Sequence, residues 1–232
     1  KQHILKNYKT DESKIRLIHR CVNMENFNVE TTSAERMIKY LEDNNIPEDK
    51  PIVTLIGRLT NWKGQKLLIE ALHLIDNEDF FCVIIGDDQG RKKYSSELRK
   101  MIANYNMTDR FLFIRNVKDI PAAMMVSDVV LSTSIEPEAF GRIAIEGQAM
   151  GRVVVASNIG GSVETVIDGV TGRLYESTSV QALAEAIDWA LHLSTDEREK
   201  IGAAGIKNVK EHFTKQIMCD KTIEVYKELI NL

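Results

Sequence analysis

Short apolar runs alternate with segments of helical periodicity from about residue 51 to the end of the chain. The β-branched run Ile52 to Ile56 is followed by Gln65 to Ile75, whose apolar residues recur on one helical face. The runs that predict strands are Ile52 to Ile56, Phe80 to Ile85, Phe111 to Ile114, Val129 to Leu131, Val153 to Ala156 and Thr171 to Leu174. The segments that predict helices are Gln65 to Ile75, Ser95 to Tyr105, Pro121 to Val126, Gly141 to Met150, Ser162 to Ile167, Val180 to Leu193, Glu197 to Phe213 and Lys215 to Leu229. Strands joined by helical crossovers pair in parallel, so we predict an α/β fold with a Rossmann-like, doubly wound parallel sheet.

The predicted strands are almost entirely apolar rather than alternating, as expected when helices cover both faces of a sheet. Ligands of such sheets bind beyond the carboxyl ends of the strands. The loops at that edge begin at Gly57, Gly86, Arg115, Ser132 and Ser157. We therefore expect the chemistry of this protein in these loops.

The alternation places the sheet domain at residues 51–212. Residues 1–50 are more polar, and their pattern predicts a strand at Ile15 to Ile18 and an amphipathic helix from Ser33 to Leu41. Residues 213–232 form a final helical segment. The length of 232 residues suits one large domain or two small ones.

Composition excludes several classes of protein. The net charge of −4 disfavours a nucleic-acid binder, which neutralises phosphates with an excess of basic residues. No apolar run is long enough to predict a membrane-spanning helix, and the polar start of the chain does not resemble a signal peptide. Cys21, Cys82 and Cys219 are far apart and predict free thiols in a reducing compartment. We therefore expect a cytoplasmic protein.

The loop from Gly57 to Gly64 carries two cations, Arg58 and Lys63, between glycines at a strand-to-helix turn. Such cations can converge on one phosphate group while the start of the helix supplies amide donors. The spacing differs from that of a Walker A loop. The alternative is that both residues are ordinary surface charges.

The segment from Ser132 to Gly147 leaves a strand and enters a helix near Gly141. The amides of Phe140 to Ile143 are then unpaired donors at the positive end of the helix dipole. Glu138 precedes these donors, and Glu146 lies two turns further along, where a carboxylate suits a pair of sugar hydroxyls. The alternative is that these carboxylates cap a helix or cover a solvated face.

The third loop, Ser157 to Thr165, contains the glycine pair Gly160 and Gly161 before a short helix. Paired glycines permit close approach of the backbone to a ligand, and Ser162 can cap the helix. The alternative is a tight turn in which Glu164 belongs to a capping box.

Together these features resemble the carboxyl-terminal domain of GT-B glycosyltransferases, in particular the large retaining family known as family 4. The resemblance covers about residues 15 to 229 and depends on four ordered features: Gly57-Arg58 with Lys63-Gly64, Gly86-Asp87, the E-x7-E motif from Glu138 to Glu146 with Phe140-Gly141, and Gly160-Gly161 with Glu164. Two positions depart from the family pattern. Arg115 stands in the base-binding turn where glycine is usual, and Cys21 stands where the linker usually has glycine.

The resemblance implies a role for each site residue. Arg58 and Lys63 would hold the diphosphate of a nucleotide-sugar donor in place of a divalent metal, so that neither a metal nor another cofactor is expected. Glu138 would bind the donor sugar, and Glu146 the ribose. The implied catalytic residues are Arg58, Lys63 and Glu138, and the implied donor-binding residues are Gly57, Arg115, Asn116, Val117, Phe140, Gly141, Arg142, Ile143 and Glu146.

The resemblance also implies partners. The donor would be linked to UDP, GDP or ADP, and the sugar would be transferred with retention to a lipid-linked or polysaccharide acceptor. Residues 1–50 would contain an interdomain linker, and residues 213–232 a helix that crosses back to an amino-terminal acceptor domain absent from this chain. The whole enzyme would then be cytoplasmic, at the inner face of the membrane, while this part alone would bind donor and transfer poorly. The alternative is a non-catalytic nucleotide-binding or assembly module that docks on a partner chain; an oxidoreductase is disfavoured because no G-x-G-x-x-G follows the first strand.

Overall fold

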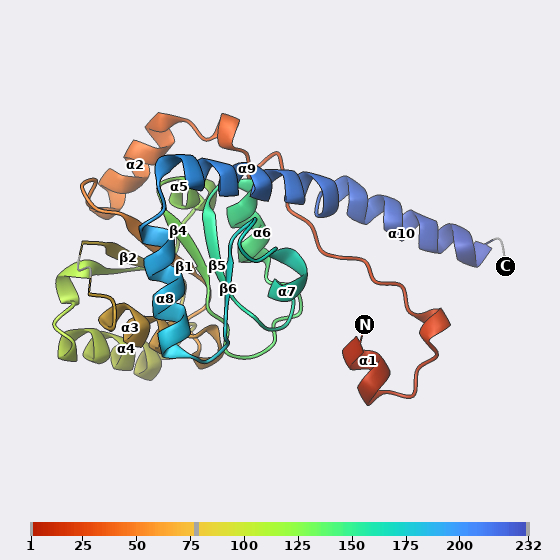
Figure 1. Ribbon diagram of the computed structural model, residues 1–232, viewed down its shortest axis with the longest axis horizontal. Coiled ribbons are helices and arrows are strands. Elements are labelled where there is room, and N and C mark those ends of the chain that lie inside the picture. Colours follow the sequence, from red (N-terminus) through yellow and green to blue (C-terminus); the bar gives the residue numbers. More distant parts are fainter. Residues whose placement is uncertain (1, 77–78, 231–232) are drawn as a thin grey trace.

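The computed structural model describes residues 2–76 and 79–230, so the outer ends of the predicted first and last segments, residues 1 and 231–232, lie outside the described residues. The centre of the molecule is a six-stranded parallel sheet in the order β3-β2-β1-β4-β5-β6 (Figure 1). Its strands are β1 Ile52–Ile56, β2 Phe81–Ile85, β3 Phe111–Ile114, β4 Val129–Ser132, β5 Val153–Ser157 and β6 Arg173–Tyr175. The predicted doubly wound α/β fold is confirmed.

Helices cover both faces of this sheet. The α-helices are α1 Gln2–Asn7, α2 Ala34–Asn44, α3 Gln65–His73, α4 Lys92–Asn104, α5 Ile120–Met125, α6 Arg142–Ala149, α7 Ser162–Thr165, α8 Val180–Leu191, α9 Thr195–His212 and α10 Lys215–Ile230, and the short 3-10 helices are η1 Glu12–Lys14, η2 Val29–Thr31, η3 Asn61–Lys63 and η4 Thr108–Arg110. The helices α3, α4 and α8 pack on one face through a single core cluster that includes Val53, Leu55 and Ile84. The helices α2, α5 and α6 pack on the other face, and α9 lies against α6.

The strand order fixes where the sheet opens. From β1 the chain moves outward to β2 and β3, then returns to place β4 on the other side of β1 before continuing to β5 and β6. The loops that follow β1 and β4 therefore leave adjacent strands in opposite directions. This topological switch point is where α/β sheets of this type bind ligands.

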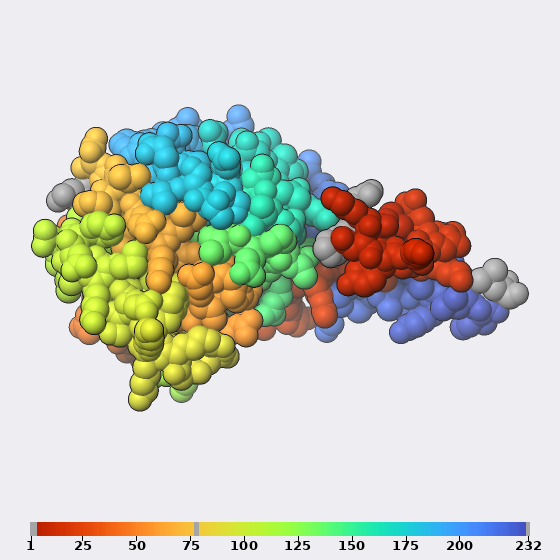
Figure 2. All heavy atoms as spheres, turned by 90° about the horizontal axis from the view of Figure 1, so that it is seen from below, coloured from red at the N-terminus to blue at the C-terminus, as the bar shows by residue number. Residues whose placement is uncertain are grey.

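The predicted strand at Ile15 to Ile18 is wrong. Residues 15–20 have no regular secondary structure and pair with no strand among the described residues. A strand needs an available sheet edge, and the segment instead lies beside α10, where Arg16 Nε donates to Glu228 at 2.9 Å (Figures 1 and 2). It joins the domain further on, where Val22 is buried and its N–H donates to Phe213 O at 2.8 Å.

The helix predicted from Ser33 is confirmed as α2, with the Ser33 side chain accepting from the N–H of Arg36. It continues beyond the predicted Leu41 to Asn44 and ends at Asn45 in the left-handed conformation. This helix belongs to the body of the molecule because Tyr40 packs in the cluster beneath β1 and β2.

The helix α10 projects from the body of the molecule (Figure 1). Its apolar residues Ile223, Tyr226 and Leu229 are exposed, while Ile217 and Val225 are half-buried. Across residues 2–76 and 79–230, every helix falls short of the length and apolarity that crossing a membrane requires.

Candidate functional site

The loop after β1 lies directly against the loop after β2. The N–H of Gly57 donates to Ile85 O at 2.9 Å, and that of Leu59 donates to Asp87 O at 3.0 Å. A Cβ on Gly86 would lie 1.9 Å from Gly57 O, so only glycine permits this contact. The Gly86-Asp87 motif of the sequence therefore has a structural reason.

The loop after β1 is also fastened to the loop after β4. Thr133 Oγ1 donates to Lys63 O at 2.9 Å, and the N–H of Ile135 donates to Trp62 O at 2.8 Å. Gly64 has a φ of 73°, and a Cβ there would lie 1.9 Å from Thr133 O. The two loops that flank the switch point thus form one connected unit.

Two of the three predicted catalytic residues, Lys63 and Glu138, are in contact in this unit. Lys63 Nζ lies 2.8 Å from Glu138 Oε2, and their side chains are only 12% and 25% exposed. Glu138 Oε2 also accepts from Ser134 Oγ at 3.2 Å. The ring of Trp62 lies 4.4 Å from Lys63 Nζ and 5.8 Å from the guanidinium carbon of Arg58, within the range of cation–π interactions.

The start of α6 supplies amide donors beside this pair. Gly141 caps the helix with a φ of 71° and no side-chain cap, as the sequence predicts. A cavity of about 500 Å³ opens here, and it is lined by Arg20, Cys21, Glu138, Ala139, Phe140, Gly141, Arg142 and Met218. A cavity of this size is large enough for a small ligand.

Glu146 lies one helical turn beyond Arg142 on α6 and is partly buried. Burial raises the pKa of its carboxyl group, and the charge of Arg142 partly opposes this effect. Glu146 is therefore not a carboxylate on a freely solvated face. Ile143, the remaining predicted residue of this helix, packs beside the cluster of Met124, Val130 and Met150.

The glycine pair after β5 approaches protein rather than open space. A Cβ on Gly160 would lie 2.5 Å from Glu138 O, and one on Gly161 would lie 2.4 Å from Phe140 Cα. The N–H of Gly161 donates to Glu138 O at 2.7 Å. These glycines hold the loop after β5 against the loop that carries Glu138.

The predicted capping by Ser162 is wrong. Gly161 is the N-cap of α7, no side chain caps this helix, and Ser162 is its first residue. The alternative capping box is absent as well, because Glu164 is turned to His19, with Oε2 lying 2.7 Å from His19 Nε2. Sequence reasoning gave His19 no role, since isolated histidines carry no local signal.

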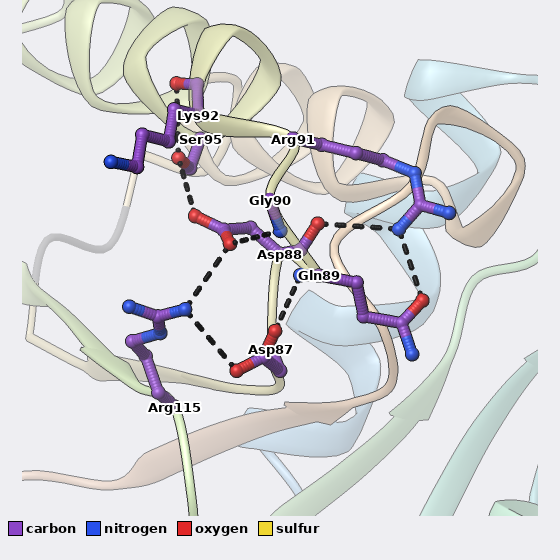
Figure 3. A network of polar contacts seen from close by, with 8 residues as sticks. All are labelled: Asp87, Asp88, Gln89, Gly90, Arg91, Lys92, Ser95 and Arg115. Carbon is purple, nitrogen blue, oxygen red and sulfur yellow. Dashed lines mark hydrogen bonds and ion pairs between the residues drawn. The ribbon is translucent and has the colours of Figure 1, made fainter.

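Arg115 lies at the carboxyl end of β3 and reaches back to the loop after β2 (Figure 3). Its guanidinium is 3.3 Å from both Asp87 Oδ2 and Asp88 Oδ1, and its side chain is 64% exposed. The pKa of Asp88 is lowered, first by the N–H of Gly90 and further by Ser95 and Arg115. Figure 3 shows that Asp88 is the centre of this network.

The structure does not bring every predicted residue to the Lys63–Glu138 pair. Asn116 and Val117 line a different cavity of about 470 Å³ between α2 and the start of α5, with Tyr40 and the ion pair of Arg36 and Asp119 among its walls. Within residues 2–76 and 79–230, no three His, Cys, Asp or Glu side chains gather to hold a metal ion.

Cations and a carboxylate at the switch point of a doubly wound sheet define a ligand-binding α/β domain. The family model of glycosyl transferases group 1 matches residues 37–208, and the chain belongs to this family. Among curated proteins, the chain is 26% identical to spore coat protein SA of Bacillus subtilis, over 98% of this chain and 62% of that protein. It is 28% identical to the D-inositol 3-phosphate glycosyltransferase of Corynebacterium glutamicum, over 90% of this chain and 50% of that enzyme.

Solved structures agree with this assignment. A glycosyltransferase from Rickettsia africae superposes with a TM-score of 0.96 at 39% identity, covering 99% of this chain and 61% of that one. HepE of Anabaena, in complex with UDP and glucose, superposes with a TM-score of 0.87 at 26% identity, covering 100% of this chain and 61% of that one. The C-terminal domain of a glycosyl transferase group 1 protein from Francisella tularensis gives a TM-score of 0.72 at 26% identity, over 84% of this chain and 99% of that one. The chain thus spans between half and about 60% of the length of these longer relatives.

Proposed function

We propose that this chain is the donor-binding part of a metal-independent, retaining glycosyltransferase. In this proposal Arg58 and Lys63 hold the diphosphate of a nucleotide-sugar, and Glu138 binds the sugar. The observation that carries the proposal is the contact of Lys63 with Glu138 across the switch point, at 2.8 Å. The proposal is also supported by HepE, a relative of the same fold whose structure contains UDP and glucose.

The geometry suits the chemistry of glycosyl transfer. When the bond between the anomeric carbon and the phosphate breaks, negative charge grows on the leaving diphosphate and positive charge on the sugar. Lys63 and Arg58 meet the first charge, and Glu138 meets the second. Because these interactions strengthen in the transition state, they accelerate the reaction, and the loss of one typically costs about 3 to 4 kcal/mol of barrier.

Retention follows in this proposal from attack on the face from which the diphosphate leaves. The leaving phosphate accepts the proton of the acceptor hydroxyl, so that no covalent nucleophile from the protein is required. The amides of Phe140 to Ile143 at the start of α6 orient the donor. Glu146 binds the ribose. Arg115 with Asn116 and Val117 borders the base, which is uracil, guanine or adenine.

The acceptor half of the enzyme lies outside this chain in our proposal. The exposed apolar residues of α10 would pack on that amino-terminal acceptor domain, and the acceptor would be a polysaccharide or a lipid-linked sugar. The whole enzyme would work in the cytoplasm, at the membrane surface. This chain alone would bind a donor and transfer sugar poorly.

Calorimetry tests the proposal on this chain directly. UDP, GDP and ADP, each free and linked to a sugar, are titrated into the wild-type protein and into Lys63→Ala. We expect one nucleotide class to bind and Lys63→Ala to weaken that binding by about tenfold or more, because a charge-assisted hydrogen bond is lost. The matched control is Lys66→Ala, since Lys66 also pairs with a carboxylate, Glu97 at 2.9 Å, away from the loop after β4. Absence of binding by all the nucleotides, or equal loss in both variants, would contradict the proposal.

The exposed face of α10 favours one second candidate, a non-catalytic module that docks on a partner chain. Under this alternative the protein self-associates or stays insoluble without its partner, whether or not nucleotide is present. Sedimentation velocity in the presence and absence of nucleotide separates the two. A well-behaved monomer that binds nucleotide favours the transferase.

A further inference from the structure

The imidazole of His19 lies where three parts of the fold meet. Its Nε2 is 2.7 Å from Oε2 of Glu164 on α7. Its ring stacks on Phe140, with centroids 5.9 Å apart and an interplanar angle of 28°, and meets the edge of Phe213 at 5.6 Å. The proposed function gives His19 no role.

Two of these partners are tied to the loop after β4, which carries Glu138. Phe140 is only two residues beyond Glu138 and is buried. Glu164 is on α7, which directly follows Gly161, the glycine whose N–H donates to Glu138 O at 2.7 Å. His19 therefore holds this loop at two points, through its ring and through its nitrogen.

The third contact of His19, with the ring of Phe213, joins it to the junction of α9 and α10. Phe213 lies between α9 and α10, and its carbonyl accepts from the N–H of Val22 at 2.8 Å. Val22 also forms a bridge with Thr214 and is only 1% exposed. The segment of His19 to Val22 is thus anchored to the α9–α10 junction, where the ring of Phe213 also meets that of Phe140, with centroids 5.8 Å apart.

We propose that His19 is a positioning residue that keeps Glu138 in place against Lys63. It connects the anchored segment to the Glu138 loop and so sets where the sugar-binding carboxylate stands. The His19 and Glu164 side chains are 27% and 47% exposed, so their contact adds little to stability. The contact positions Glu138, and its loss changes the geometry of the site more than the stability of the fold. The role in sugar binding depends on the proposed function, whereas the effect on geometry does not.

A spectroscopic test needs no ligand. The chain has two tryptophans, Trp62 and Trp189. Trp62 lies 4.4 Å from Lys63 Nζ and reports the Lys63–Glu138 geometry, while Trp189 packs beside Arg173 and serves as an internal reference. After labelling with 5-fluorotryptophan, we expect His19→Ala and Glu164→Ala to move the fluorine resonance of Trp62 and leave that of Trp189 in place. The double variant should shift no further than His19→Ala, because the contact that Glu164→Ala removes is already lost in His19→Ala.

Conservative variants separate the two contacts of His19. His19→Gln keeps a donor near the position of Nε2, and His19→Phe keeps the ring, so each should restore part of the Trp62 signal. His192→Ala is the matched control, because His192 also lies beside a carboxylate, Asp188 at 3.3 Å, and should change nothing at Trp62. An unchanged Trp62 resonance in folded His19→Ala and His19→Gln would overturn the proposal, and so would shifts that add in the double variant.

Titration with a nucleotide-sugar then links position to binding. Since His19 acts through Glu138, we expect His19→Ala to weaken the sugar-linked nucleotide about fivefold or more while the free nucleoside diphosphate changes less than about twofold. Equal weakening of both ligands would contradict a role at the sugar. If no nucleotide binds the wild-type protein, the proposed function fails, and the fluorine experiment still decides whether His19 positions Glu138.

Discussion

The ammonium nitrogen of Lys63 lies 2.8 Å from Oε2 of Glu138, although the two residues are 75 positions apart in the sequence. Lys63 follows β1 and Glu138 follows β4, the adjacent strands at which the chain reverses its direction across the sheet. Both side chains are largely withdrawn from solvent, so their interaction is less screened than that of a surface pair. In our proposal this pair lies where the leaving diphosphate and the sugar are bound side by side.

Replacement of Glu138 by glutamine distinguishes binding of the sugar from binding of the diphosphate. The change keeps the size of the side chain and removes the negative charge beside Lys63. We expect the affinity for free nucleoside diphosphate to stay the same or rise, since Lys63 no longer has a competing carboxylate, and the affinity for the sugar-linked nucleotide to fall. Calorimetry with both ligands measures the difference. Parallel loss of both affinities would show that Glu138 does not act at the sugar.

The raised pKa of Glu146 makes stability depend on pH. Burial favours the protonated carboxyl, so the folded protein keeps this proton to higher pH than the unfolded chain does. Its stabilising effect is fully present below the ordinary glutamate value of 4.5 and is lost as the pH rises through the raised folded value. Glu146→Gln, which is neutral at every pH, should therefore gain stability relative to the wild type between pH 4 and pH 7 in urea unfolding.

The control for that measurement is Glu97→Gln. The hydrogen bond from Lys66 lowers the pKa of Glu97, so the wild-type carboxylate stabilises the fold above the unfolded value and loses this effect as the pH falls. The Glu97 variant should therefore lose relative stability over the same rise in pH. Slopes of the same sign in both variants would refute the assignment of Glu146 as a buried carboxyl.

Gly64 should tolerate no side chain. It has a φ of 73°, and a Cβ would lie 1.9 Å from Thr133 O, a backbone atom of the loop after β4. We expect Gly64→Ala to cost more than about 3 kcal/mol of unfolding free energy and to weaken nucleotide binding, because strain and overlap add. Gly90→Ala is the matched control: its φ is 84°, nothing lies within 4 Å, and it should cost only about 1 kcal/mol. Similar losses in the two variants would mean that the contact between the loops is not tight.

Removal of divalent metal should leave donor binding unchanged. Arg58 and Lys63 supply the positive charge in our proposal, so nucleotide affinity in EDTA should equal that in magnesium within about twofold. Parallel titrations in the two buffers measure this. A donor that binds only with magnesium would require a different account of the diphosphate.

Most of the sheet could be predicted from the apolar runs because buried parallel strands are continuous and short. The sixth strand begins two residues later than its apolar pattern suggests. Residues 168–172 close a turn first, in which the N–H of Gly169 donates to Gly172 O and Asp168 Oδ1 accepts from the N–H of Leu174. The strand expected at Ile15 to Ile18 does not form, because a local pattern cannot show whether a sheet edge is available.

The site could be predicted less completely. The loops that carry Lys63 and Glu138 follow from the strand order, but their actual contact depends on the close fit around Gly64 and cannot be deduced from spacing. The contact of His19 with Glu164 joins residues 145 positions apart and leaves no periodic signal. The sequence predicts that the glycines after β5 let the backbone approach a ligand, whereas the structure places them against the Glu138 loop.

The central claim is that the diphosphate of a sugar donor lies between the loops after β1 and β4. A crystal structure of this chain with the nucleotide that binds in calorimetry tests it most directly. Our account predicts phosphate oxygens within hydrogen-bond distance of Lys63 Nζ and the Arg58 guanidinium, beside the amides at the start of α6. Density that places the phosphates away from both of these loops, with Lys63 still bound only to Glu138, would contradict it.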